Sequence, residues 1–257
     1  MNYFFSVSNN ILKTKLTIPQ FRNDGMCDKS YRPFKASIKN KKWEISPAKH
    51  KYKNNFFLIN ENEMDNKSIF FLDKKNNMVL NNQKFFINEL KDFNSYTDTI
   101  PEFRANLRIY SEDGGYSSYQ SEYPFKMINK KGSIVSPISA LTNLKADINL
   151  LFIKNIFYKP IKEKFNVFFV NLKNQKVVFK KTCFTNCTNE IEIDKTFITP
   201  DTYLFSENFI CVPMFVSILN NQISFEHTHP PQLYLLSKEK FKIIANIKRK
   251  INEIIYS

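Results

Sequence analysis

Short apolar bursts recur along the whole chain, and this pattern limits the fold more than any other feature of the sequence. Examples are Phe56–Ile59, Ile69–Leu72 and Phe85–Ile87, each separated from the next by Asn, Asp or Lys. The 257 residues include 26 Phe and 12 Tyr but only four Gly. Because aromatic residues favour strands and the bursts are too short for helices, the pattern predicts a succession of strands.

Two later segments, Val167–Val170 and Val212–Ile218, are apolar at nearly every position. Such runs predict central strands that are buried on both faces, with a bulge or an edge near Pro213. The chain ends in a different period, because isoleucines at helical spacing predict an amphipathic helix over 238–256, capped by Ser237. We therefore predict a mainly β fold, an antiparallel β-sandwich or barrel-like sheets, with the C-terminal amphipathic helix packed on the sheet.

The pattern is weakest over Lys91–Pro101. We therefore expect an N-terminal β-rich region over 1–100 and a main β-sandwich or barrel over 101–257 that includes the helix. The only tryptophan, Trp43, lies in a short strand-like piece and is expected to be a buried anchor.

The chain carries 38 Lys and Arg against 24 Asp and Glu, a formal net charge of +14. A positive field attracts polyanions, but basic residues indicate nucleic-acid binding only where they cluster. The densest basic stretch of the first half, Lys49–Lys53, is expected to be a solvated loop. The alternation over Phe103–Tyr110 predicts a half-buried strand whose outer face is basic. A nucleic acid therefore ranks below a small molecule or glycan as the predicted partner.

The four cysteines are irregularly spaced, and Met1–Lys13 has no secretory leader pattern. No apolar run reaches the roughly 20 residues that span a bilayer. We expect a cytoplasmic protein with free thiols and no membrane span. The sequence predicts no oligomeric state.

A first candidate site lies at the turn over Ser111–Gly115, whose Asp-Gly and Gly-Gly pairs favour a hairpin. Acidic and aromatic side chains beside such a turn suit a hydroxyl-rich ligand such as a sugar. The alternative is an ordinary polar hairpin end. The residues predicted to bind a ligand are Asp113, Tyr116, Tyr119 and, from a later strand, Glu226.

A second candidate site is the pair His227 and His229, which precedes Pro230-Pro231. Residues two apart on a strand share a face, so both imidazoles extend an apolar face while Glu226 points away. Imidazole is a common ligand of divalent transition metals, so the pair predicts a metal site near the strand end.

The His-Thr-His run resembles the H-x-H of the cupins, which are small β-barrel proteins. The resemblance implies a metal-dependent β-barrel enzyme in which His227 and His229 are metal ligands. No histidine follows His229, so a metal site needs a third ligand that the sequence does not supply locally. Two alternatives are a Cys2His2 zinc site that adds Cys183 and Cys187, and a pair of hydrogen-bonded histidines without metal.

Complete catalytic signatures are missing from the sequence: there is no glycine-rich phosphate loop, nucleophile elbow or H-E-x-x-H. The sequence therefore predicts a β-sandwich binding or accessory protein related to carbohydrate. The metal-dependent cupin-like enzyme is the alternative.

Overall fold

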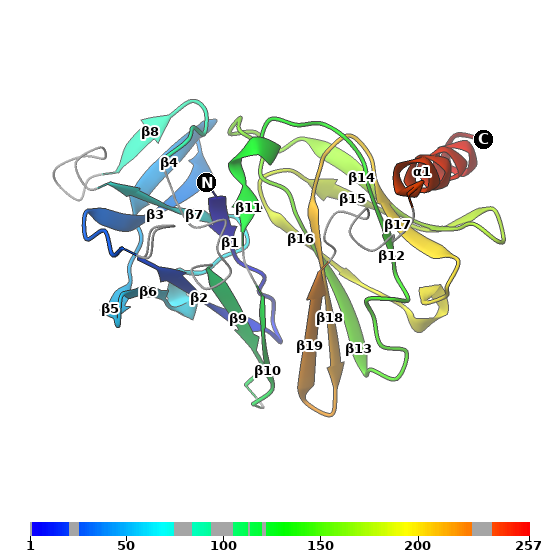
Figure 1. The fold of residues 1–257 in the computed structure, drawn as a ribbon, viewed down its shortest axis with the longest axis horizontal. Coiled ribbons are helices and arrows are strands. Elements are labelled where there is room, and N and C mark those ends of the chain that lie inside the picture. The colour runs from blue at the N-terminus through cyan, green and yellow to red at the C-terminus, as the bar shows by residue number, and fades with distance from the viewer. Residues whose placement is uncertain are drawn as a thin grey trace.

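The structure is a computed structural model that describes residues 2–20, 26–74, 84–93, 105–112, 114–119, 122–227 and 238–257. The described residues form four antiparallel sheets and one C-terminal α-helix, α1 (Lys240–Tyr256). Figure 1 shows the first two sheets at the left, the other two at the right and α1 at the right edge.

The first two sheets are built mainly from the N-terminal half of the chain. Sheet I has the order β11 (Tyr123–Pro124), β1 (Asn2–Phe5), β7 (Ile69–Lys74), β3 (Tyr31–Lys39), β4 (Lys42–Pro47), β8 (Phe85–Ile87). Sheet II has the order β10 (Tyr116–Tyr119), β9 (Asn106–Tyr110), β2 (Lys13–Pro19), β6 (Phe56–Ile59), β5 (Lys51–Lys53).

The other two sheets come from the C-terminal half. Sheet III has the order β16 (Thr188–Glu192), β13 (Ile148–Lys154), β18 (Val212–Leu219), β19 (Gln222–His227). Sheet IV has the order β12 (Ile134–Pro137), β17 (Thr202–Ser206), β14 (Lys164–Asn171), β15 (Lys176–Phe184). Three 3-10 turns complete the described elements: η1 (Glu61–Glu63), η3 (Phe125–Met127) and η4 (Lys195–Phe197).

Alternation along β13 shows how these sheets are layered. Leu150 and Phe152 pack in a first core with sheets I and II, whereas Leu151 and Ile153 pack in a second core with sheet IV. Sheet III is therefore covered on both faces at β13 and β18, which explains why these two strands are apolar at consecutive positions.

Sheet IV repeats this arrangement one layer further on. Phe169 of β14 faces the second core, while Phe168 faces a third core that it shares with α1. In that third core Ile251 is the fully buried residue of the helix. The helix predicted over 238–256 is confirmed from Lys240 onward, and Ser237 lies outside the described residues.

The predicted mainly β, antiparallel fold with a C-terminal helix is thus confirmed, but the expectation of a single sandwich or barrel is corrected. The four sheets follow one another in a propeller-like arrangement. A two-sheet sandwich leaves the outer face of each sheet in water, and the apolar faces of sheet III do not allow this.

Strands after residue 100 pair with strands before it, since β9 pairs with β2 and β11 pairs with β1. The division into 1–100 and 101–257 stays a prediction. The loop predicted over Lys49–Lys53 is wrong for its last three residues, which form the exposed edge strand β5.

Buried polar contacts join sheets I and II to the C-terminal half. Trp43 is fully buried, as predicted, and its Nε1 donates to the carbonyl oxygen of Tyr158 at 2.9 Å. The Thr188 hydroxyl donates to the carbonyl oxygen of Ser6 at 2.7 Å. Such contacts satisfy polar groups that the first core would otherwise bury alone.

Three hairpins turn on asparagine where glycine would be expected. Positive φ occurs at Asn40 and Lys41, at Asn54 and Asn55, and at Asn220 and Asn221, each pair forming the whole connection between two strands. Two successive residues with positive φ define the type I′ turn, and Asn tolerates this conformation better than most residues. In a chain with only four glycines, asparagine therefore occupies most of these turn positions.

Candidate functional site

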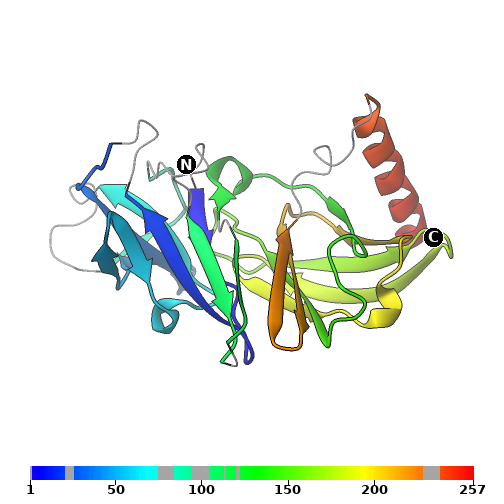
Figure 2. The ribbon, with the colours of Figure 1, turned by 60° about the horizontal axis from the view of Figure 1, so that its bottom comes forward.

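The structure brings the two predicted candidate sites together. The hairpin of β9 and β10 lies beside the hairpin of β18 and β19, and in Figures 1 and 2 both tips point to the same end of the molecule. A Cβ atom placed on Gly115 would lie 1.8 Å from the backbone oxygen of Asn221. Glycine is therefore required at this position by the neighbouring turn.

Tyr119 and His227 meet in this junction. Tyr119 is only 7% exposed, and its ring lies edge-to-face against the His227 imidazole with 4.4 Å between the centroids. Its ring also lies 5.1 Å from that of Phe225. Tyr119 and His227 therefore close the edge of the first core.

The remaining predicted residues are placed as follows. Tyr116 is 62% exposed, and Glu226 is exposed on the opposite face of β19 from Phe225, as the alternation predicted. Asp113 and His229 lie outside the described residues. Asp113, Tyr116, Tyr119 and Glu226 as ligand-binding residues stay predictions, as do His227 and His229 as metal ligands.

Two of the four residues of the Cys2His2 alternative, Cys183 and His227, do not come together. Cys183 packs in the second core, whereas His227 lies against Tyr119 of the first, on the other side of sheet III. Within the described part of the chain, no group of three or more His, Cys, Asp or Glu side chains could hold a metal ion.

The exposed face of sheet II gathers residues that the sequence separates. Residues directly opposite on antiparallel strands share a face, and the pairings align Lys13 with Tyr110 and Tyr116, and Lys15 with Arg108. The pairing of β2 with β6, and of β6 with β5, places Lys51 and Lys53 on the same face. We call this surface the basic face: Lys13, Lys15, Lys51, Lys53, Arg108, Tyr110 and Tyr116.

Burial confirms that the basic face is the outer side of the sheet. On β9, Arg108 is exposed while its neighbours Leu107 and Ile109 are fully buried in the first core. The same alternation places Lys15 of β2 outside and Leu16 inside. The half-buried strand with a basic outer face that the sequence predicts is thereby confirmed for Asn106–Tyr110.

Two cations of the basic face lie over its tyrosine rings. The Arg108 guanidinium lies 4.1 Å from the ring centroid of Tyr116, and the Lys15 ammonium lies 4.7 Å from that of Tyr110. Cation–π contacts hold long basic side chains along the surface without neutralising their charge.

Carboxylates are rare on this sheet. The five strands of sheet II contain five Lys and Arg residues and no Asp or Glu. Beside them Glu112 forms an ion pair with Lys13 that raises the pKa of the lysine, with a smaller contribution from Glu61. The basic face therefore keeps a positive balance.

No protein-family model, no curated protein and no solved structure matches this chain.

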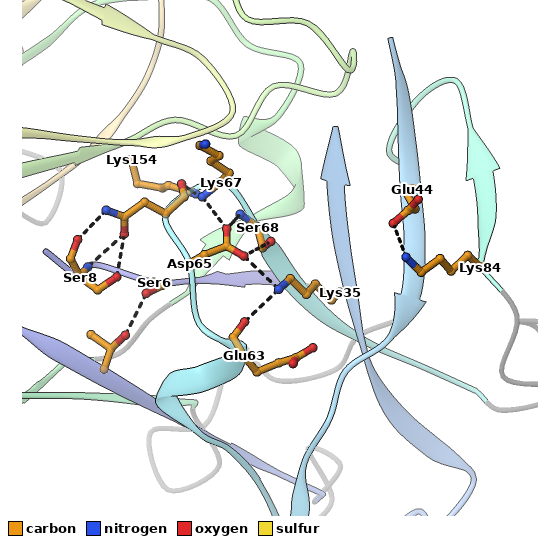
Figure 3. A network of polar contacts seen from close by, with 12 residues as sticks. Ser6, Ser8, Lys35, Glu44, Glu63, Asp65, Lys67, Ser68, Lys84 and Lys154 are labelled. Carbon is orange, nitrogen blue, oxygen red and sulfur yellow. Dashed lines mark hydrogen bonds and ion pairs between the residues drawn. The ribbon is translucent and has the colours of Figure 1, made fainter. Parts of the chain in front are cut away.

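One chemically notable residue escapes the sequence pattern. Lys154 ends β13 and is fully buried, and Figure 3 shows it beside the polar network around Asp65. Its Nζ donates to the Asn66 carbonyl oxygen at 3.4 Å and lies 5.9 Å from the Phe5 ring centroid. No ion pair involves Lys154 among the described residues.

Burial dominates the pKa of Lys154, whereas hydrogen bonds dominate the pKa of Asp65. Burial lowers the pKa of Lys154 from 10.5 to about 8, although Cys187 and Asp65 lie near enough to oppose the shift. Burial alone would raise the pKa of Asp65, but hydrogen bonds from Lys35 and Ser68 outweigh it and hold that pKa below its usual value. Asp65 is thus satisfied by Lys35, at 2.9 Å, rather than by Lys154.

A first prediction concerns the contact between the two hairpins. Gly115→Ala should lower the free energy of unfolding by about 2–4 kcal/mol, because its Cβ would overlap a backbone atom that cannot move alone. Gly114→Ala is the control, since its φ is +101° but nothing lies within 4 Å of the new Cβ. It should cost only about 1–2 kcal/mol of backbone strain. Denaturant unfolding that shows equal losses would contradict the close contact.

A second prediction concerns Lys154. The folded protein releases this proton near pH 8 and the unfolded chain near pH 10.5, so the contribution of Lys154 to the free energy of unfolding should rise across that window. Burial raises the pKa of Cys183 and Tyr123, whose contributions fall as the pH rises, so the effect is measured as the difference between the variant and the original protein. The gain is about 3 kcal/mol at about 1.4 kcal/mol per pKa unit. Lys154→Met should remove this rise and be at least as stable as the original protein at pH 7.

Exposed Lys180→Met is the control and should keep the original pH profile. Denaturant titrations at several pH values measure the effect. A difference in free energy of unfolding between Lys154→Met and the original protein that stays constant from pH 8 to 10.5 would show that Lys154 does not titrate there.

Proposed function

We propose that this chain is a binding or accessory protein that contacts an anionic ligand through the basic face of sheet II. The observation that carries the proposal is the gathering of five cations and two tyrosines on one exposed sheet face whose strands contain no carboxylate. A cluster of this kind concentrates anions by its local field, and the net charge of +14 strengthens that field.

Rigidity supports this choice. On β2 and β9 the residues of the basic face alternate with residues of the first core, so packing fixes the position of these two strands. A site on packed strands loses less conformational entropy on binding than one on loops. The basic face is therefore preorganised for a ligand that lies across several strands.

The carbohydrate part of the hypothesis rests on Tyr116, whose exposed ring could stack on a sugar. An acidic glycan would use the same cations, so the glycan proposal and the basic face are compatible. The four cysteines are free thiols, which supports the proposed cytoplasmic location. None of the described helices is long and apolar enough to cross a membrane.

The test uses heparin, an acidic glycan that reports on any polyanion-binding surface. The double variant Lys15→Gln, Arg108→Gln should elute from a heparin column at clearly lower salt than the original protein. The matched control, Lys164→Gln, Lys176→Gln, removes two exposed charges from sheet IV and should elute close to the original. Equal shifts for both double variants would show that retention follows net charge alone and would overturn the proposal.

A further inference from the structure

We infer that the ligand of the basic face is a single-stranded nucleic acid. This inference rests on the proposed function, because it names the class of anion that the same surface binds. The sequence ranked a nucleic acid low partly because a basic patch must be clustered to indicate binding. Folding supplies that cluster by bringing β2, β5 and β9 into one sheet.

The first argument is the arrangement of positive charge. Lys15 and Arg108 lie opposite one another, and Lys51 and Lys53 continue the positive charge to the far edge of the sheet. The cations are therefore spread across the width of the sheet rather than gathered around one point. Such a surface can neutralise the phosphates of an extended chain at successive positions. A single small anion would contact only one or two of these cations.

A cation–π pair lies at one end of this surface. Arg108 lies 4.1 Å from the Tyr116 ring, and Tyr116 is 62% exposed. Bases stack on aromatic rings and on guanidinium planes, and this stacking tolerates any base. The pair thus offers what a nucleobase needs, next to cations that its phosphates need.

The exposed ring of Tyr116 favours a single strand over a duplex. In a duplex the bases stack on each other and their faces are not accessible to a side chain on a sheet surface. In a single strand the bases can turn toward the protein and lie on an exposed ring. Tyr116 would then contribute only to single-strand binding, while the lysines would contribute to both.

Binding is measured with a fluorescently labelled oligo(dT) of 12 nucleotides and with oligo(U) of the same length, by anisotropy at several salt concentrations. The original protein should bind both probes, with a slope of log K against log salt of about −0.7 for each phosphate contacted. Lys15→Gln should reduce the magnitude of this slope by about 0.7. An unlabelled duplex should compete less well than an unlabelled single strand.

Tyr116→Leu isolates the stacking contribution and should weaken oligo(dT) binding about tenfold. The control is Tyr256→Leu, which removes an equally exposed tyrosine from α1 and should leave binding unchanged. Both side chains are exposed, so circular dichroism melting should show that both variants fold.

The possible results distinguish the proposed function, binding of an anionic ligand, from the inference that this ligand is a single-stranded nucleic acid. Retention on heparin without binding to either oligonucleotide would overturn the nucleic-acid inference and leave the proposed function standing. Loss of both would overturn both. Equal effects of Tyr116→Leu and Tyr256→Leu, or equal competition by duplex and single strand, would show that charge alone is read and would contradict the stacking argument.

Discussion

Sheet III depends on having a packed layer on each of its faces, and the rest of the structure follows from this constraint. Leu150 and Leu151, adjacent on β13, belong to different cores. Sheet IV covers one face and needs α1 on its own far side. Sheets I and II cover the other face, and the outer side of sheet II is left in water. That side can therefore carry lysines and arginine without a desolvation cost, which makes it the natural place for a charged ligand.

Much of this fold was predictable, because local patterns report which residues are buried. The apolar runs at Val167–Val170 and Val212–Ile218 are buried strands, and helical spacing located α1. The layering was not predictable, since period-2 alternation shows that a strand has a buried face but not which sheet covers it. Nor could the sequence show that an edge strand would begin at Lys51, because β5 is held by its pairing with β6 and not by its own composition.

The candidate site was predictable only in part. Tyr116 and the basic outer side of Asn106–Tyr110 followed from alternation, but their neighbours on β2 and β5 lie far away in the sequence and join them only through strand pairing. The burial of Tyr119 was not predictable from its place beside a polar turn, because its contact with His227 at the edge of the first core comes from a distant strand. Lys154 gave no local signal, because burial of the last residue of a strand depends on what covers its end.

The central claim, that the basic face is the binding surface, is tested most directly by footprinting lysines in solution. The protein is labelled with an amine-reactive reagent with and without a saturating polyanion, and labelling of each lysine is measured by mass spectrometry. The account predicts that the polyanion protects Lys15, Lys51 and Lys53 while Lys164 and Lys176 label as before. Protection centred on Lys164 and Lys176, or uniform labelling at all five positions, would contradict it.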